Sequence, residues 1–383
     1  MDFDLNDDQR LLKESVDRLM ADRYGFEQRK AHGAGAEGWS REMWARYAEF
    51  GLLALPFEER HGGIGGGSVE TMIVMEAFGR ALALEPYLAT VVLCGGFLRL
   101  GAAPALQDAL IPKIADGSLT LAFAHTERQS RYDLADVSTA ARADGGGWVL
   151  DGAKGVVLHG DGADRLIVTA RVGGGQRDRD GIGLFVVDAG ASGVTRRGYP
   201  TQDGLRAAEV TLSGVRGAAG DVIGEPGRAL PLIEHVVDTA IAALAAEAIG
   251  AMAELHELTV DYLKTRKQFG VAIGGFQALQ HRAVEMFVAL EQARSMAMFA
   301  TMMAGEADDG ERRRAIAAAK VQVGRSARFI GQQATQLHGG IGMTMEYKGG
   351  HYFKRLTMID MMFGDADHQL RELARRGGLI DAA

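Results

Sequence analysis

Apolar residues recur at intervals of three and four over the C-terminal part of the chain, after Pro231. Such series cover residues 241–262, 279–297 and 323–337. This is the spacing of one apolar face of an α-helix, so each series predicts a long amphipathic helix. Because these stretches are rich in alanine and poor in aromatic residues, the helices are expected to pack closely as an antiparallel bundle.

The middle of the chain, from about residue 119 to residue 227, has a different pattern of short runs rich in Val, Ile and Leu. Turns rich in Gly and Asp separate the runs. This pattern is typical of short strands, so it predicts a small antiparallel barrel or sandwich. The runs are residues 148–150, 166–168, 184–187 and 210–212.

The first 118 residues favour helix, with breaks at residues 33–35, at residues 61–67 and around Pro104. The Gly-rich break at 61–67 lacks the Gly-Lys-Ser/Thr of a phosphate-binding loop and follows no apolar strand, so it is interpreted as a flexible turn. The patterns together predict three domains: a helical domain over 1–118, a β domain over 119–227 and a helical bundle over 228–383.

Composition and charge narrow the class of protein. The chain has 383 residues, 47% of them hydrophobic, so it can bury a large core. Its net charge of -8 means that it has no overall positive field to attract nucleic acid. Its start is acidic where a leader peptide would be basic, and no apolar run approaches the ~20 residues of a membrane span. We therefore expect a cytoplasmic protein without a membrane anchor. Its one cysteine, Cys94, excludes an internal disulfide, and its ten histidines lack metal-ligand spacing.

Two C-terminal segments contain the residue types that a dinucleotide requires. Such a cofactor needs a cation for its pyrophosphate, close backbone approach and an aromatic face for adenine. Arg266, Phe269 and Gly270 supply one of each in the segment Arg-Lys-Gln-Phe-Gly. Taken alone, this segment also fits a helix C-terminus with basic residues and a terminal glycine. A Gln-x-x-Gly-Gly turn follows at residues 336–340, where missing side chains expose backbone amides.

These two segments resemble the C-terminal signatures of the acyl-CoA dehydrogenase family, and the likeness extends along almost the whole chain. The resemblance implies an α+β fold with an N-terminal helical domain, a middle antiparallel β domain and a C-terminal four-helix bundle. It implies FAD as the cofactor, held in part across a subunit interface, so this chain is expected to complete a neighbour's FAD site. The residues that it assigns to FAD are Arg266, Phe269, Gln336, Gly339, Gly340, Phe123, His125 and Thr126.

The chain departs from the family at the flavin end. In the stretch that resembles Thr-Glu-Pro-x-Ala-Gly-Ser-Asp, Arg128, Arg131 and Tyr132 replace proline, glycine and serine. Leu158 replaces a threonine that donates to flavin N5, and leucine has no donor. The two arginines are candidates for the carboxylate of a dicarboxylyl-CoA or for a CoA phosphate. The interpretation that we favour is ion pairing with their acidic neighbours Glu127, Asp133 and Asp136.

The chain also departs at the catalytic base. Most of the family removes the acidic α-proton of the thioester with the glutamate of a Tyr-Glu-Gly-Thr turn, and Phe363 occupies that position here. The position that a minority of relatives use is Ala240. The backbone N–H of Phe363 is expected still to bind the thioester carbonyl. Asp365 is a candidate displaced base, although an Asp at this place also fits helix capping. Weaker candidates are Glu247, Asp238 and His338.

Within the family, the chain most resembles the small subunit of pimeloyl-CoA dehydrogenase and similar heteromeric enzymes. The resemblance implies a second, catalytically complete acyl-CoA dehydrogenase subunit, an acyl-CoA substrate and an electron-transfer flavoprotein as partners. One alternative is a homo-oligomeric flavoenzyme that uses Asp365. Another is a structural subunit that binds neither flavin nor CoA.

Overall fold

The computed structural model describes residues 4–378, which form two compact units. One unit contains the chain up to Ala31, the segment Ser68–Ala83 and the chain from Ile241 onward. The other unit contains His32–Gly67 and Leu84–Ala240. The helices predicted for the first 118 residues therefore divide between a unit built on the C-terminal helices and a unit built on the sheet.

The sheet unit is built on eight strands in the order β6-β7-β3-β2-β4-β5-β8, with β1 paired to β4. The predicted apolar runs lie in β3, β4, β5 and β7. Alternate residues of these strands, such as Leu166, Val168 and Val210, are buried in one apolar core. The strands are β1 Leu121–Ala124, β2 Ala140–Asp144, β3 Gly147–Leu158, β4 Arg165–Arg171, β5 Ile182–Asp188, β6 Val194–Pro200, β7 Arg206–Ala218 and β8 Val222–Ile223.

The sheet is mixed, which corrects the expectation of a wholly antiparallel one. Strand β1 lies parallel to β4, with Leu121 opposite Arg165 and Ala124 opposite Val168. Strand β2 also meets β4 in a parallel pair, at Ala140. Long connections separate these strands along the chain, so the local hairpin pattern that the sequence displays does not determine their direction.

The sheet unit also contains short helices. The expected break at Pro104 is the first position of a helix, where proline is well tolerated. Cys94 is fully buried, and burial raises the pKa of its thiol. These helices are α3 Arg41–Glu49, η1 Leu52–Ala54, η2 Glu59–His61, the π-helix η3 Leu88–Cys94, α5 Gly95–Gly101, α6 Pro104–Ala115 and η4 Ala219–Asp221. Helix α2 Phe26–Ala34 begins in the helical unit and ends in the sheet unit.

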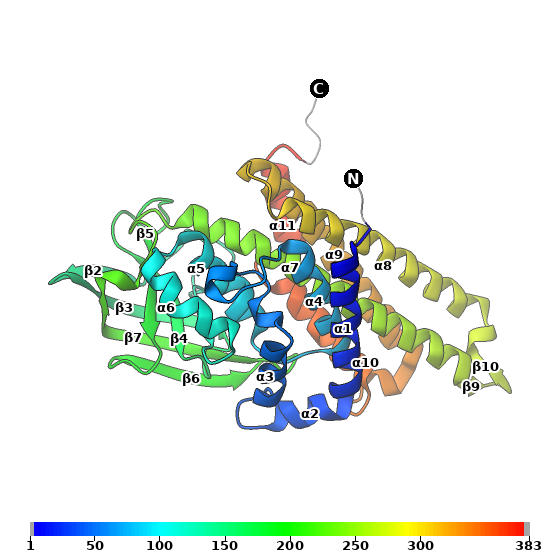
Figure 1. The fold of residues 1–383 in the computed structure, drawn as a ribbon. Coiled ribbons are helices and arrows are strands. Elements are labelled where there is room, and N and C mark those ends of the chain that lie inside the picture. Colours follow the sequence, from blue (N-terminus) through cyan, green and yellow to red (C-terminus); the bar gives the residue numbers. More distant parts are fainter. Residues whose placement is uncertain (1–3, 379–383) are drawn as a thin grey trace. The chain divides into compact units, whose positions relative to one another are not determined.

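The helical unit confirms the predicted C-terminal helices. Helices α8 and α9 run side by side (Figure 1), α10 and α11 pack against α9, and α1 packs against α4. An Asn6 capping box begins α1. The elements are α1 Asp7–Arg23, α4 Ser68–Ala81, the part of α7 Leu230–Thr265 from Ile241 onward, β9 Lys267–Gln268, β10 Val271–Ala272, η5 Ile273–Gly275, α8 Gln277–Met303, α9 Asp309–His338, η6 Gly339–Met343, α10 Lys348–Met361 and α11 Ala366–Arg375.

Helices α4 and α7 approach each other closely through two glycines. A Cβ on Gly79 would lie 1.9 Å from the carbonyl oxygen of Glu247, and a Cβ on Gly250 would lie 1.8 Å from that of Glu76. Helix α7 is also long and apolar enough to cross a membrane by composition, with a mean hydropathy of 1.6 over its most apolar stretch. The expectation that no apolar run approaches that length was wrong. Because 94% of this stretch is buried inside the protein, α7 has the features of a core helix.

Candidate functional site

The Arg-Lys-Gln-Phe-Gly segment forms a tight hairpin at the end of α7. Strands β9 and β10 pair across a turn in which Phe269 and Gly270 have φ angles of 55° and 81°. Positive φ at both turn residues is the geometry that closes a two-residue hairpin. Gly270 therefore serves the hairpin turn and does not cap the helix. Phe269 is 91% exposed and Arg266 is also exposed, so both side chains are available to a ligand or another chain.

The Gln-x-x-Gly-Gly turn presents open backbone at the end of α9. Gly339 caps the helix with a φ of 62°, and a Cβ built on Gly339 or Gly340 would meet nothing within 4 Å. Gln336 is exposed on the last turn of α9. The turn has the unobstructed approach that a phosphate group requires.

A buried histidine joins the two segments. The ring of His338 lies 4.7 Å from that of Tyr262, which is on α7 one turn before Arg266. Its Nδ1 lies 2.8 Å from the carbonyl oxygen of Ala334 and its Nε2 lies 2.9 Å from the hydroxyl of Tyr347. Nδ1 therefore carries the proton, and Nε2 accepts from Tyr347. Burial lowers the pKa of His338, so it is a neutral packing residue that holds both cofactor segments at one end of the bundle.

In the sheet unit, the predicted flavin-side residues lie at the end of β1, with Phe123 in the strand and His125 and Thr126 directly after it. The rings of Phe123 and His125 stack at 5.4 Å, and Phe97 packs on Phe123 at 4.6 Å. His125 is buried, and its Nδ1 lies 3.1 Å from the hydroxyl of Thr169. Burial and the charge of Lys154 lower the pKa of His125 to about 3, so this imidazole is neutral.

Thr126 is fixed by its backbone while its side chain stays open. Its carbonyl accepts a hydrogen bond from the N–H of Gly155 at 2.8 Å. Its neighbours His125 and Glu127 are both bonded to the ammonium of Lys154. The Thr126 hydroxyl has no hydrogen-bond partner within residues 4–378, and the residue is half-buried. Residues Lys154 and Gly155 in the second half of β3 thus hold an unpaired hydroxyl where the resemblance places a flavin contact.

The expected ion pairs of Arg128 and Arg131 do not form. Glu127 pairs with Lys154 at 2.6 Å, and Asp136 pairs with Arg177 at 2.8 Å. Glu127 is buried, and its ion-pair partner is Lys154 of strand β3. An arginine on the surface therefore does not pair with this carboxylate. In the part of the chain that the structure describes, Arg128 and Arg131 make no ion pair or hydrogen bond. Both are exposed.

Strand β3 is irregular where family members carry a flavin-binding threonine. A bulge separates Lys154 from Val157, and Val156 within it has a φ of 51°. The left-handed region is costly for a β-branched residue, and such strain is typical of functional sites. Leu158 ends the strand and contributes no donor, as predicted from its side chain.

The turn after α10 holds the backbone of Phe363 in an unusual conformation. Phe363 and Gly364 have φ angles of 56° and 104°. The Gln369 side chain donates a hydrogen bond to the Phe363 carbonyl at 2.8 Å. The N–H of Phe363 has no acceptor among the described residues, so it remains available to bind a carbonyl. Sequence reasoning did not identify Gln369, because nothing in a single sequence marks this contact.

The structure gives Asp365 the capping role. Its carboxylate accepts a hydrogen bond from the N–H of His368 at 2.8 Å and begins α11. Asp360 supports the same helix start by accepting from the N–H of Ala366 at 3.1 Å. The second base position, Ala240, is fully buried. The carboxylate in this turn, that of Asp365, is therefore engaged in the helix cap through its Oδ1.

The weaker candidate Glu247 is a structural residue. Its two carboxylate oxygens accept from Arg355 at 2.5 and 2.7 Å, and both side chains are buried. A buried bidentate pair of this kind holds α7 against α10 and is not free to accept a substrate proton. Asp238 is also buried. Over residues 4–378, no cluster of His, Cys, Asp and Glu is placed to hold a metal.

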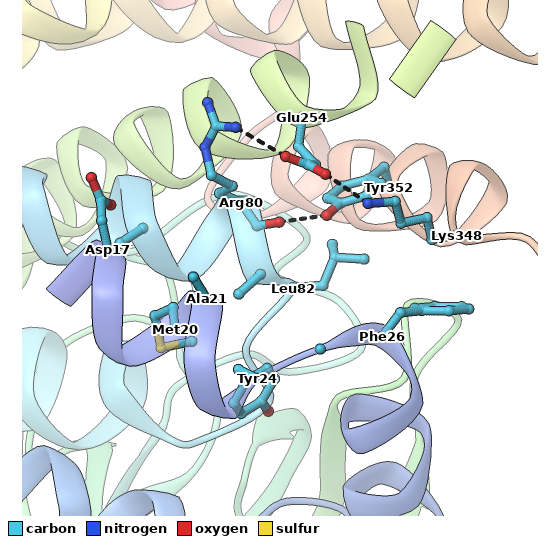
Figure 2. A pocket seen from close by; sticks show the side chains of 13 residues that line it. Asp17, Met20, Ala21, Tyr24, Phe26, Arg80, Leu82, Glu254, Lys348 and Tyr352 are labelled. Carbon is cyan, nitrogen blue, oxygen red and sulfur yellow. Dashed lines mark hydrogen bonds and ion pairs between the residues drawn. The ribbon is translucent and has the colours of Figure 1, made fainter. Parts of the chain in front are cut away.

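The helical unit contains a separate cavity of about 320 Å³ (Figure 2). Glu254 joins the side chains on its wall, accepting from Arg80 at 2.9 Å and from Lys348 at 2.6 Å. The Tyr352 hydroxyl donates to the Arg80 carbonyl. These polar groups satisfy one another, and none of the predicted site residues lines the cavity.

Comparison with known proteins decides the family. The chain matches the acyl-CoA dehydrogenase N-terminal domain over residues 6–118, the middle domain over 122–215 and the C-terminal domain over 232–378. It is 31% identical over 317 residues to the probable acyl-CoA dehydrogenase FadE25 of Mycobacterium tuberculosis, which covers 81% of this chain and 80% of that protein. The chain belongs to the acyl-CoA dehydrogenase family.

Solved structures agree with this assignment. The Tcur3481-Tcur3483 steroid ACAD is 28% identical, with a TM-score of 0.87 over 96% of this chain and 97% of that one. The FAD complex of PigA is 26% identical, with a TM-score of 0.90 over 99% of this chain and 100% of that one. These matches confirm the expected acyl-CoA dehydrogenase fold, with helical N-terminal and C-terminal regions and a β-sheet middle region.

Proposed function

We propose that this chain is a subunit of a heteromeric, FAD-dependent acyl-CoA dehydrogenase and that its partner subunit supplies the catalytic base. The reaction is α,β-dehydrogenation of an acyl-CoA thioester, in which the flavin accepts the β-hydride. In this account the chain contributes contacts to the adenine side of FAD. The partner contributes the base and the flavin face.

The observation that carries this proposal is the turn at Phe363. A dehydrogenase of this family needs a carboxylate to remove the α-proton, and phenylalanine has none. Asp365 is occupied by the cap of α11, and Ala240 is apolar and buried. The free N–H of Phe363 supports thioester binding, since a backbone donor polarises a carbonyl without any side chain.

A second observation supports the contribution to FAD. Arg266 and Phe269 project from the hairpin after α7 and are exposed, and His338 holds this hairpin beside the open backbone at Gly339 and Gly340. A 91% exposed phenylalanine is costly in water. Its exposure is explained if it packs on the adenine of an FAD shared with another subunit. The glycine turn at residues 339–340 precedes the 14-residue helix α10, and Phe363 follows the helix. These two candidate sites therefore lie at opposite ends of a helix that is roughly 20 Å long.

For the substrate, Arg128 and Arg131 support an acyl chain that ends in a carboxylate. Both side chains are exposed, and within the described residues neither has an acidic partner. Two unpaired guanidinium groups in the segment that follows Thr126 suit a dicarboxylyl-CoA, since arginine binds carboxylate through two parallel hydrogen bonds. We assign electron removal to an electron-transfer flavoprotein and place the enzyme in the cytoplasm.

Two alternatives remain within the family. In one, the chain forms a homo-oligomer and uses Asp365 after the turn rearranges. In the other, it is a structural subunit that binds neither flavin nor CoA. The cap formed by Asp365 disfavours the first, and the exposed Arg266 and Phe269 disfavour the second.

The test is the flavin content and flavin reduction of the chain with and without its partner. The chain is purified alone and as a complex with a subunit that carries an intact Tyr-Glu-Gly-Thr turn, and the visible spectrum gives flavin per polypeptide. An acyl-CoA panel is then added anaerobically. We expect flavin that bleaches in the complex and little or no bleaching with the chain alone. One flavin per chain, bleached without a partner, would establish the homo-oligomeric enzyme instead.

A further inference from the structure

A fully buried lysine lies beneath the flavin-side loop. Lys154, on β3, forms an ion pair with Glu127 at 2.6 Å, and the side chains are 0% and 2% exposed. Removing two charges from water costs several kcal/mol per ion, so such a pair adds little net stability compared with apolar packing. What the pair holds in place is therefore more informative than its contribution to the free energy of unfolding.

The ammonium of Lys154 has three N–H donors, and each has an acceptor on another residue. It donates to the carbonyl of His125 at 3.2 Å, to a Glu127 carboxylate oxygen at 2.6 Å and to the Thr169 hydroxyl at 3.0 Å. His125 and Glu127 are the two residues that flank Thr126. One side chain thus fixes the backbone before Thr126 and the side chain after it.

The next residue of β3 completes the arrangement. The N–H of Gly155 donates to the carbonyl of Thr126 at 2.8 Å, so consecutive residues of one strand hold three consecutive residues of the loop. Glu127 is fixed further by the N–H groups of Ser138 and Thr139, at 2.9 and 3.0 Å. These contacts engage the backbone of Thr126 and its two neighbours, and among the described residues the Thr126 hydroxyl is left without a hydrogen-bond partner.

The charge state of the pair is consistent with this role. Burial acts to raise the pKa of Glu127, but the charge of Lys154 together with hydrogen bonds from Lys154, Ser138 and Gln129 outweighs burial, and the pKa of this carboxyl falls below its usual range. Burial lowers the pKa of Lys154 to about 8. At neutral pH the lysine is therefore protonated, and all three of its donors are available.

We propose that Lys154 is the positioning residue that aims the Thr126 hydroxyl at the flavin. This inference rests on the proposed FAD function, because it requires a flavin beside Thr126. Lys154 is fully buried and does not touch the cofactor, so it acts through the loop that it holds. The same arrangement explains why Arg128 and Arg131 remain free: Lys154 already neutralises the nearest carboxylate.

A double-mutant cycle tests the proposal. The FAD dissociation constant is measured for the wild-type complex, for Lys154→Met, for Thr126→Ala and for the double variant. Each single change is expected to weaken FAD binding about tenfold, the equivalent of one lost hydrogen bond to a polar group. The double variant is expected to be no weaker than the single ones, because Lys154 acts only through Thr126. Additive losses would overturn the proposal.

Lys320 supplies the matched control. It is equally buried, and its ammonium donates to the carbonyl of Ile359 in the helical unit, within a network that does not include Thr126. Lys320→Met is expected to lower the melting temperature. It should not weaken the contact of Thr126 with FAD, because Lys320 does not hold the Thr126 loop. If Lys154→Met lowered stability to the same degree and left FAD binding unchanged, Lys154 would be a packing residue only.

A second measurement needs no flavin. Hydrogen exchange of the wild-type chain and of Glu127→Gln, a milder change than Lys154→Met, reports on the Gly155 amide that bonds to Thr126. We expect faster exchange at Gly155 and across residues 125–130 in Glu127→Gln than in the wild type, with the bundle unchanged. Unchanged exchange there would overturn the positioning role even if the wild type bound FAD. A wild-type complex without FAD would overturn the proposed function, and exchange would then decide the positioning role by itself.

Discussion

The carboxylate of Asp365 accepts a hydrogen bond from the backbone N–H of His368 at 2.8 Å, and this contact begins α11. Asparagine caps a helix about as well as aspartate but cannot act as a base. We therefore expect Asp365→Asn to retain both the stability of the protein and the turnover of the complex. Asp365→Ala should lose about 1 kcal/mol of unfolding free energy, because it removes the cap.

Thermal unfolding and turnover are measured on the same preparations of these two variants. A loss of turnover in Asp365→Asn, with the melting temperature retained, would identify Asp365 as the displaced base and support the homo-oligomeric alternative.

The exposed hairpin residues give a prediction on flavin content. Replacing both Arg266 and Phe269 with alanine removes a cation and an aromatic face from the adenine side. Because a charge-assisted hydrogen bond contributes about 1.5–3 kcal/mol, we expect FAD affinity of the complex to fall at least tenfold. Phe50→Ala is the control, since Phe50 is 48% exposed but lies outside the motif. Unchanged flavin content in the hairpin variant would favour a purely structural subunit.

Substrate preference should depend on the two unpaired arginines. Arg128→Gln and Arg131→Gln are expected to raise the KM for a dicarboxylyl-CoA about tenfold, with little change for a monocarboxylyl-CoA of the same length. If the arginines bind a CoA phosphate instead, both substrates should weaken equally. Arg142→Gln is the control, because Arg142 is an exposed arginine of the same unit. No change with either substrate would exclude both roles.

Buried His125 predicts a loss of stability in acid. Burial lowers its folded pKa to about 3, well below the ordinary value of about 6.5, so the unfolded chain binds this proton first. The stabilisation is complete above pH ~6.5 and decreases by up to ~1.4 kcal/mol per pH unit as the pH falls toward 3. Burial also lowers the pKa values of His338, His351 and His368, which adds to the slope with the same sign.

Urea unfolding between pH 7 and pH 4 measures this slope. His125→Gln should unfold with a shallower pH dependence than wild type, whereas the same change at the exposed His281 should leave the slope as it is. Equal slopes for wild type and His125→Gln would show that folding does not lower the pKa of His125.

Several features of the fold could be predicted because they depend on local patterns. The intervals of three and four after Pro231 match α7, α8 and α9, and the short apolar runs match the long strands of the sheet. The parallel pairing of β1 with β4 could not be predicted, because it joins strands about forty residues apart and no turn residue encodes it. Only the expectation that no apolar run approaches the length of a membrane span was wrong, because the buried core helix α7 is as apolar as such a span.

The candidate site was predictable only in its motif residues. Counting forward from Glu346 and Tyr347 assigns Phe363 to the base position by resemblance, and this assignment stays a prediction. The hydrogen-bond partners of these residues could be identified only from the three-dimensional structure. Gln369 bonds to Phe363, Lys154 to Glu127, and His338 to Tyr347. The favoured ion pairs of Arg128 and Arg131 were wrong because proximity in sequence did not reveal that Lys154 occupies the buried carboxylate.

The central claim is that this chain supplies no catalytic base, and one measurement tests it most directly. The complex is prepared with the glutamate of the partner's Tyr-Glu-Gly-Thr turn changed to glutamine, and the flavin spectrum is followed anaerobically after an acyl-CoA is added. We predict that FAD remains bound and oxidised, while the unmodified complex bleaches. Bleaching in the modified complex at a rate near that of the unmodified one would contradict the account, because the α-proton would then be removed by a residue of this chain.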